Sequence, residues 1–167
     1  MFGRGKKKPL DLIFFPMINS LDSSLSQVED HAACPTVTVT PEVVKAAMTK
    51  EEDLFAKSGI QYINPMLNVS DRALFERQMF NTFADLLGIS RKENKAAVLN
   101  GFDNLSQYKK QLQQKGKAIL DSITSNDQIS IVILARAYHN DPGINHEIPD
   151  QLQALGYPIL SIDSLPV

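Results

Sequence analysis

The sequence of 167 residues contains one cysteine, Cys34, and no tryptophan. A single cysteine cannot form an internal disulfide, which excludes the small disulfide-stapled scaffolds of secreted proteins. A net positive charge is also absent: the formal net charge is −2, and the only basic run, residues 4–8, lies at the amino-terminal end. A nucleic-acid-binding protein needs a basic surface and a recognition motif, so we expect no nucleic-acid partner.

Long apolar runs are missing as well, because none approaches the roughly 20 residues that cross a bilayer. We therefore expect no membrane partner. The basic run and residues 10–18 resemble the start of a signal peptide, but Asp11 and Pro16 interrupt the apolar stretch, and a polar segment separates it from Cys34. A lipoprotein cleavage site would directly follow the apolar core. We predict a cytoplasmic protein in which residues 1–8 are a basic tail or a remnant of expression.

The rest of the chain alternates between strand-like and helix-like segments. Four segments predict strands: 11–18, 59–64, 129–135 and 157–162. Pro16 should mark the end of the first strand, since proline lacks a ladder donor. The almost unbroken β-branched run ISIVILA at 129–135 is typical of a central parallel strand buried on both faces. Residues 36–40 (TVTVT) suit a short strand or extended segment.

Helix signals separate these strands. Thr40, Pro41 and Glu42 predict a helix start, with the helix running to about Met48. An apolar pattern over 75–87 is followed by Gly88, a typical residue after a helix end. A capping box at 90–93 predicts the start of a long helix over 91–122. A last helix is expected over 145–155 and should end at Gly156.

The long helix carries two glycines and one narrow apolar stripe. Gly101 and Gly116 each cost about 1 kcal/mol in a helix, which favours a kink or break. We hypothesise that Phe102 and Leu112, on the stripe, face another domain or a second copy of the chain. A homo-oligomer is therefore one expected state.

Together these segments predict one α/β domain over residues 9–167. The alternation favours a three-layer fold with a mainly parallel sheet flanked by helices, in a Rossmann-like or flavodoxin-like topology. Residues 71–125 would form a helical insertion between two strand-containing halves.

Ligands of parallel sheets bind beyond the carboxyl ends of the strands, where two segments of interest fall. The first is the loop 19–35, which carries Cys34. This thiol could ligate a metal, or act as a nucleophile with His139 or His146 as base. No hydrolase motif supports the second role. The alternative is an inert cysteine that packs as a small hydrophobic residue.

The second segment is 136–147 (RAYHNDPGINHE), which follows the predicted central strand. Its polar and aromatic side chains are candidates for binding a ligand or cofactor: Arg136, Tyr138, His139, Asn145 and His146. The alternative is local: Arg136 would pair with an acid, and Asn140 and Asp141 would shape the turn. Asn145 could cap the helix that follows, and His146 would be a surface residue of its first turn. The chain has neither a Gly-x-Gly-x-x-Gly motif nor a Walker loop, so nothing in it indicates nucleotide binding.

The segment 135–166 (ARAYHNDPGINHEIPDQLQALGYPILSIDSLP) resembles a conserved domain found beside the ATPase domains of 2-hydroxyacyl-CoA dehydratase activase-related proteins. The resemblance also covers DLIFFPMINSL, the Cys34-Pro35 pair and GISRKE, and so nearly all of 9–167. The matching positions are Arg136, Tyr138, His139, Asp141, Pro142, Asn145, Ile148, Pro149, Gly156 and Asp163.

The resemblance implies iron–sulfur chemistry. In that family an ATPase component with an iron–sulfur cluster passes an electron to a dehydratase whose clusters are held by cysteines, one of them in a Cys-Pro pair. Cys34 stands at that position. A cluster generally needs four ligands, and this chain supplies one cysteine. The family's upstream segment with a further cysteine is replaced here by MFGRGKKK, and the ATPase motifs are absent. The chain then resembles a fragment, or a member that has lost the cluster.

Two classes of function follow. In the first, the chain is a dehydratase-like domain of a 2-hydroxyacyl-CoA dehydratase and activase system, with Cys34 as one ligand of an iron–sulfur cluster. Its expected partners are activase ATPase or dehydratase-like domains and, through the larger assembly, an acyl-CoA. In the second, it is a non-catalytic module that binds a ligand or partner through the 136–146 loop. In neither class is the isolated chain expected to be an active enzyme.

Overall fold

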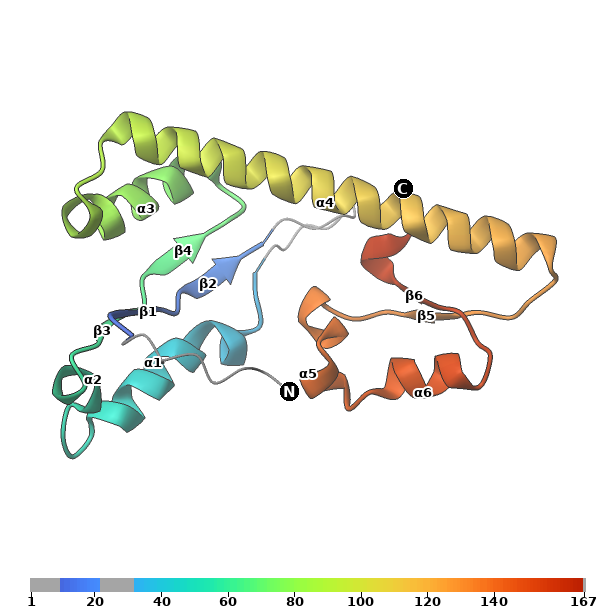
Figure 1. Cartoon of the computed structure of the whole chain (residues 1–167), viewed down its shortest axis with the longest axis horizontal. Coiled ribbons are helices and arrows are strands. Elements are labelled where there is room, and N and C mark those ends of the chain that lie inside the picture. Colours follow the sequence, from blue (N-terminus) through green and yellow to red (C-terminus); the bar gives the residue numbers. More distant parts are fainter. Residues whose placement is uncertain (1–9, 22–31, 167) are drawn as a thin grey trace. The chain divides into compact units, whose positions relative to one another are not determined.

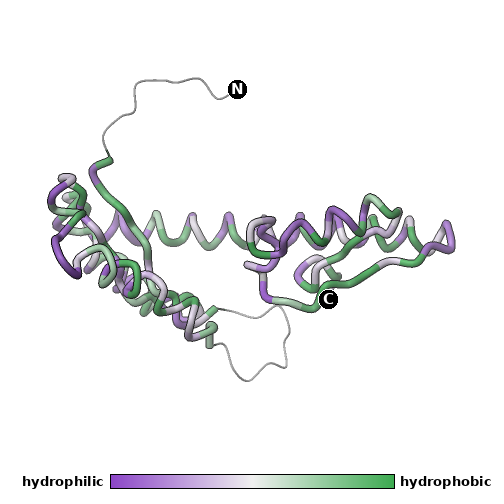
Figure 2. Tube along the Cα trace, turned by 90° about the horizontal axis from the view of Figure 1, so that it is seen from below, coloured by the Kyte–Doolittle hydropathy of each residue, from purple (hydrophilic) through white to green (hydrophobic). Residues whose placement is uncertain are grey.

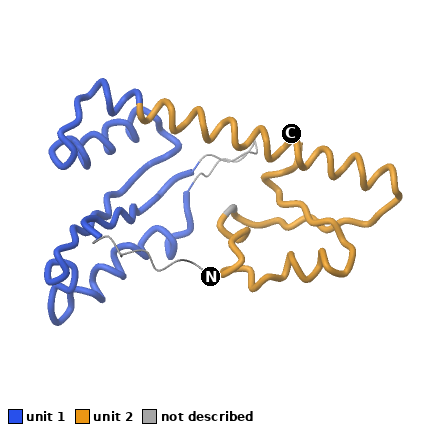
Figure 3. Tube along the Cα trace, in the orientation of Figure 1, with its two compact units in different colours: residues 1–96 blue, residues 97–167 orange. Residues whose placement is uncertain are grey.

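The chain is a mixed α/β protein of helices and short parallel strand pairs (Figure 1). The structure, a computed structural model, describes residues 10–21 and 32–166. The predicted basic tail and residues 22–31 of the loop before Cys34 lie outside these residues. The chain divides into two compact units, residues 1–96 and 97–167 (Figure 3), which are described separately. The predicted α/β class with parallel strands is confirmed, whereas the boundaries of a single domain stay a prediction.

Unit 1 contains an interrupted parallel ribbon. Its strands are β1 (Leu12–Phe14), β2 (Met17–Ser20), β3 (Gln61–Ile63) and β4 (Met66–Asn68). β1 pairs with β3 and β2 with β4, and Leu12–Gln61 and Met17–Met66 have the same register offset. Pro16 and Pro65 therefore face each other in the gap. Pro16 interrupts the predicted strand 11–18 without ending it, and β4 is a strand that the sequence reading missed.

The ladder hydrogen bonds explain how this ribbon accommodates two prolines. The amides of Phe15 and Met17 donate across the ribbon to the carbonyls of Ile63 and Pro65, each at 2.9 Å. In a parallel ladder the residue between them, here Pro16, points its own N and C=O away from the partner strand, to the opposite edge. Pro16 thus removes no donor from the ladder. Pro65 lies at a position that should donate, so the ribbon loses one rung there.

Helix α1 (Pro35–Thr49) corrects two predictions. Residues 36–40 are helical and not extended, and the helix begins before Thr40. Threonine hydroxyls bind carbonyl oxygens here: Thr40 Oγ1 donates to Thr36 O at 2.7 Å, and Thr38 Oγ1 to Ile18 O at 2.8 Å. The second bond ties α1 to β2. β-Branched residues have only a weak bias against helix, which such tertiary contacts override.

Pro41 lies inside α1, where proline usually costs a helix about 3 kcal/mol or more. Its side chain is fully buried, and the hydroxyl of Tyr62 donates to its carbonyl oxygen at 2.7 Å. Tyr62 also stacks on Phe55 of α2 (Leu54–Lys57), with ring centroids 4.5 Å apart. Phe55 and Leu67 are buried in the core of unit 1. Packing of β3, α1 and α2 around these rings thus holds a helix that its sequence disfavours.

Helix α3 (Arg72–Leu87) confirms the predicted helix over 75–87. The carboxylate of Asp71 caps it by accepting from the amide of Leu74 at 3.0 Å. Gly88 follows with a φ of 63°, a left-handed conformation that glycine adopts without steric cost. Phe83 packs edge-to-face on Phe14 of β1, with ring centroids 5.0 Å apart, and so holds α3 against the ribbon.

Helix α4 (Arg91–Ser125) opens with the predicted capping box. The amide of Ser90 donates to Glu93 Oε2 at 2.8 Å, and the amide of Glu93 donates to Ser90 Oγ at 3.3 Å. Asn94, which is 4% exposed, donates from Nδ2 to Glu76 O of α3 at 2.9 Å. These bonds fix the beginning of α4 in unit 1.

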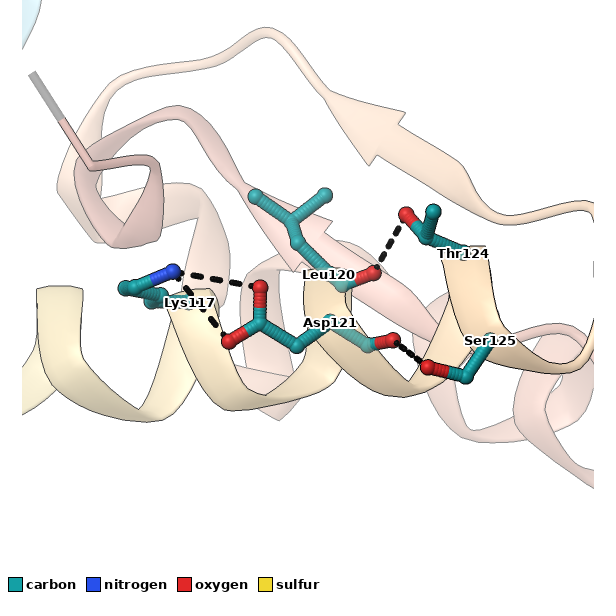
Figure 4. A network of polar contacts seen from close by, with 5 residues as sticks. All are labelled: Lys117, Leu120, Asp121, Thr124 and Ser125. Carbon is teal, nitrogen blue, oxygen red and sulfur yellow. Dashed lines mark hydrogen bonds and ion pairs between the residues drawn. The ribbon is translucent and has the colours of Figure 1, made fainter.

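Hydrophobic and hydrophilic residues recur in turn along α4 (Figure 2), as an amphipathic helix requires. The helix is continuous, so the predicted break at Gly101 or Gly116 is wrong. Near its end, Lys117 pairs with Asp121 at 3.1 Å, and the hydroxyls of Thr124 and Ser125 donate to carbonyls one turn earlier (Figure 4). No described helix is long and apolar enough to cross a membrane.

Unit 2 is a strand–helix–strand unit. Its elements are η1 (Ala137–Asn140), α5 (Pro142–Asn145), α6 (Ile148–Ala154) and η2 (Ile162–Ser164), with the strands β5 (Ile131–Ile133) and β6 (Ile159–Ser161). β5 and β6 are parallel. The predicted helix over 145–155 is confirmed only over α6, because His146 and Glu147 have positive φ values of 53° and 60° and separate α6 from α5. Gly156 follows α6 as predicted, with a φ of 92°.

The strand predicted to be central is exposed in the described residues. Val132 is 38% exposed, and Ile129 and Leu134, which flank β5, are 74% and 77% exposed. Each described sheet has two strands, and β5 pairs with β6 alone among them. The apolar run ISIVILA therefore does not form a strand buried on both faces in the described residues. The described residues show strand pairs and not the predicted three-layer Rossmann-like sheet.

Candidate functional site

Cys34 lies just beyond the carboxyl end of β2. Ala32 bridges to Ser20, the last residue of β2, and the amide of Ala33 donates to Asn19 O at 2.9 Å. Cys34 follows as the N-cap residue of α1 and is half-buried, with its carbonyl accepting from Thr38 at 2.9 Å. Cys34 therefore lies at the carboxyl end of a parallel strand, which is where parallel sheets bind ligands.

A polar network occupies the same end of the ribbon. Ser20 Oγ contacts Ser70 Oγ, and Ser70 Oγ donates to Asn68 Oδ1 at 3.0 Å. The amide of Asn68, at the end of β4, donates to Gln78 Oε1 of α3 at 3.0 Å. Sequence reasoning missed these residues. The signal was present, since Asn68 to Asp71 is a polar strand end followed by a helix cap, but Pro65 concealed the strand.

The described residues include no group of three or more His, Cys, Asp or Glu side chains that could hold a metal ion. Cys34 therefore has at most one such neighbour suited to share a metal ion among them. His139 and His146, the bases considered for a cysteine nucleophile, belong to unit 2, whereas Cys34 belongs to unit 1. The roles proposed for Cys34 stay predictions.

The predicted binding loop of unit 2 is a locally bonded turn. The rings of Tyr138 and His139 lie 4.5 Å apart, and His139 Nδ1 is 3.2 Å from Arg136 O. Asn145 Nδ2 donates to His139 O at 3.0 Å, while its Oδ1 accepts from Glu147 N at 2.9 Å. These contacts join four of the five predicted residues, and Arg136 takes part through its backbone.

The side chains of this loop differ in exposure. Arg136, His139 and His146 are exposed, whereas Tyr138 and Asn145 are half-buried. His146 stands at the helix break, in the left-handed conformation. Asn145 does not cap α6 as the local alternative suggested, because the N-cap residue is Glu147; its side chain instead bonds within the turn, to His139 O and Glu147 N. Whether any of the five binds a ligand stays a prediction.

A pocket of about 310 Å³ lies beside this loop, within unit 2. Asn145 is the one predicted site residue that lines it. The other lining residues come from α4, β5, the loop, α6, β6 and η2: Leu112, Lys115, Gly116, Ile119, Ile133, Asn140, Pro142, Pro149, Asp150, Gln153, Ile159, Leu160, Ser161 and Ser164. Sequence reasoning identified the apolar stripe of α4, which contributes Leu112 and Ile119 to this pocket, but not the pocket itself.

The groups with clearly shifted pKa values serve structure in unit 1. Burial, and then the negative charge of Glu42, raises the pKa of Tyr62 above its ordinary value of 10.0. The backbone and side-chain hydrogen bonds from Ser90 lower the pKa of Glu93 below 4.5. Tyr62 holds Pro41 and Glu93 closes the capping box, so neither shift marks a catalytic group.

A family described as the CoA enzyme activase uncharacterised domain matches residues 6–165, which is nearly the whole chain. No curated protein and no solved structure matches.

Proposed function

Because the chain belongs to the family of the CoA enzyme activase uncharacterised domain, we propose that it works as a dehydratase-like domain of a 2-hydroxyacyl-CoA dehydratase and activase system. Its role there is to contribute to iron–sulfur-dependent electron transfer for acyl-CoA dehydration. Activase ATPase or dehydratase-like domains are its partners, and the acyl-CoA binds to the larger assembly. The proposal places this work in the cytoplasm.

The position of Cys34 carries this proposal. A half-buried cysteine at the start of a helix, beyond the end of a parallel strand, is suited to hold a cluster at a protein surface that a partner covers. The polar network of Ser20, Ser70 and Asn68 lies at the same end of the ribbon. It would fix the strand ends beside the sulfur.

The described donor set does not fit a complete cluster. A cluster generally takes four ligands, mostly thiolates, and this sequence has one cysteine. We therefore propose Cys34 as one ligand, with the others supplied by partner domains or by a second chain. No electron-transfer step can be assigned to residues of this chain beyond holding that one position.

Iron and acid-labile sulfide, measured per chain after anaerobic reconstitution, test the proposal. We expect both in the wild type and neither in Cys34→Ala, since the variant lacks the thiolate. Asn104→Ala is the control, because Asn104 is exposed, lies outside every candidate site and bonds only one turn back to Asn100 O, which leaves Cys34 in place. Equal iron in wild type and Cys34→Ala, or none in either when the activase partner is also present, would contradict a role for Cys34.

The second candidate is a non-catalytic module that binds a ligand or partner through the 136–146 loop. The observation that favours it is the pocket in unit 2, which Asn140 and Asn145 of this loop line. A chain without iron that still associates with its partners would support this alternative. Asn145→Ala should then weaken that association, whereas Cys34→Ala should leave it unchanged.

A further inference from the structure

The pocket of about 310 Å³ in unit 2 lies at the carboxyl ends of both strands of its sheet. Ile133 and Ser161, which line it, are the last residues of β5 and β6. Asn140 and Ser164 line it from η1 and η2, the segments that follow these strands. Loops and helix starts gather at this end of a parallel sheet, so it is where such sheets bind ligands. We name this hollow the strand-end pocket.

One wall of the strand-end pocket is aliphatic. α4 and the sheet beside it (Figure 1) supply branched side chains: Leu112, Ile119, Ile133, Ile159 and Leu160. No lining residue of this pocket is aromatic. A nucleobase or another flat ring would therefore have no ring to stack on. The wall favours a ligand with an aliphatic surface.

The side formed by η1, α5 and α6 carries neutral hydrogen-bonding groups. The carboxamides of Asn140, Asn145 and Gln153 line it. Asn145 holds the turn, since its Nδ2 donates to His139 O and its Oδ1 accepts from Glu147 N. Asn140 and Gln153 form no side-chain hydrogen bond with any residue that the structure describes. A carboxamide offers a donor and an acceptor together, so these two can bind a group that has both.

The formal charges of the strand-end pocket cancel. Among its lining residues, Lys115 of α4 is the one cationic side chain and Asp150 of α6 the one anionic side chain. Neither forms an ion pair with a described residue. A phosphate or carboxylate would be attracted by Lys115 but repelled by Asp150, and it would find no arginine to hold it bidentately. A neutral ligand meets no such conflict.

A second pocket, of about 330 Å³, adjoins the first. Both are lined by Ile119, Gln153 and Ile159, and the second also reaches Tyr157 and Pro158. Gln153 lines both pockets, so it lies where they meet. The combined hollow is longer than either pocket and therefore suits a chain-shaped ligand more than a compact one.

We propose that the strand-end pocket binds a neutral aliphatic chain that carries amide groups. The aliphatic wall contacts its methylene and methyl groups, and Asn140 and Gln153 bond to its amide N–H and C=O. Two sources share this chemistry: the pantetheine arm of a coenzyme A thioester, which has two amides on an aliphatic chain, and a short apolar peptide. Only the first source rests on the proposed function.

Titration of the isotope-labelled full chain with small probes, followed by NMR, tests the proposal. The probes are pantetheine and N-acetyl-leucine N-methylamide, one for each source. We expect binding to shift the side-chain amide signals of Asn140 and Gln153 and the backbone amide of Ser161. Shifts with pantetheine alone would identify coenzyme A as the source, and shifts with the leucine diamide alone would identify a peptide.

Three relatives of the leucine diamide test the class of ligand. N-acetyl-leucine methyl ester replaces an amide N–H by oxygen, and we expect it to bind about fivefold more weakly because one hydrogen bond is lost. N-acetyl-leucine carries a free carboxylate, and leucine N-methylamide carries an ammonium group. Both should bind more weakly than the neutral diamide, since the pocket holds one charge of each sign.

Two substitutions on α6 locate the amide contact. Gln153→Leu removes a carboxamide that lines the pocket, and Gln151→Leu removes one that is also exposed but does not line it. We expect Gln153→Leu to weaken binding of the probe by about fivefold and Gln151→Leu to leave it unchanged. Asn140→Leu should act like Gln153→Leu. Circular dichroism checks that each variant is folded.

Three outcomes would overturn the proposal. The first is no shift of the lining residues with either probe. The second is tighter binding of the ester or of a charged relative than of the diamide. The third is equal weakening by the folded Gln153→Leu and Gln151→Leu. The titration needs neither iron nor an activase, so its failure is distinct from failure of the proposed function.

Discussion

At the scale of single residues, the two glycines of α4 have different surroundings. An added Cβ at Gly116 would lie 1.8 Å from Ser164 O, whereas at Gly101 it would meet nothing within 4 Å. We expect Gly101→Ala to raise the free energy of unfolding by about 0.5–1 kcal/mol, because alanine is the better helix former. Gly116→Ala should lower it by about 1 kcal/mol or more, because α4 must move away from η2.

Urea denaturation of both variants and the wild type measures this difference. Equal stabilisation by the two alanines would mean that α4 and η2 are not in contact. The sequence assigned the two glycines the same helix cost, and it could not distinguish them. What separates them is the approach of a segment 48 positions later in the chain, Ser164 against Gly116, which no local pattern reveals.

At the scale of elements, the capping box of α4 makes stability depend on pH. The pKa of Glu93 is lower in the folded chain than its ordinary value of 4.5, chiefly because the amide of Ser90 donates to its carboxylate. A lowered folded pKa means that the stabilisation is present above about pH 4.5 and is lost as the pH falls through the folded pKa. We expect Glu93→Gln to have a lower free energy of unfolding than the wild type at neutral pH. Below neutral pH, its free energy of unfolding should depend less on pH than that of the wild type.

Urea midpoints of the wild type and Glu93→Gln, taken between about pH 6 and pH 3, check this prediction. Glu51→Gln, a surface carboxylate outside the box, is the control and should follow the wild type. Parallel curves for the wild type and Glu93→Gln would mean that the box does not form in solution.

Helix ends were the elements that sequence predicted best. Ser90, Gly88 and Gly156 carry their signals within a few residues, and each lies where it was expected. Helix α1 was predicted wrongly because its support is distant in sequence. Thr38 bonds to β2 and Pro41 to Tyr62 of β3, so tertiary contacts hold a helix whose local sequence resembles a strand.

At the scale of the whole molecule, the division into two units predicts separate responses to mutation. The buried Asn94 bonds to Glu76 within unit 1. Asn94→Ala should cost about 1–2 kcal/mol and leave Glu76 O without this donor. We expect faster amide exchange in α3 and at the start of α4, with β5 and β6 unchanged.

Asn104→Ala is the control for this prediction. Asn104 is exposed and bonds one turn back to Asn100 in α4, so its loss should change exchange in neither α3 nor the sheets. Faster exchange of β5 and β6 in Asn94→Ala would show that the chain unfolds as one cooperative body.

The candidate site was predictable only where a general rule of topology applies. Cys34 lies beyond the carboxyl end of a parallel strand, as the position of its loop led us to expect. The pocket of unit 2 was not predictable, because α4 and β6 line it together and only Asn145 was foreseen. The apolar run 129–135 predicted a buried central strand, but this strand is not buried in the described residues.

The two prolines of the interrupted ribbon have a consequence for solubility. The nitrogen of Pro16 points to the outer edge of the β1–β2 strand. A strand of another chain that paired with this edge would need an N–H donor there, and proline has none. This edge therefore resists the unwanted pairing that leads to aggregation. β6 contains no proline, and its register with β5 turns the peptide N–H groups of Ile159 and Ser161 to its outer edge, where Ser164 Oγ donates to Ser161 O at 2.6 Å. During production of the protein without its partner, aggregates should form through unit 2 more readily than through unit 1.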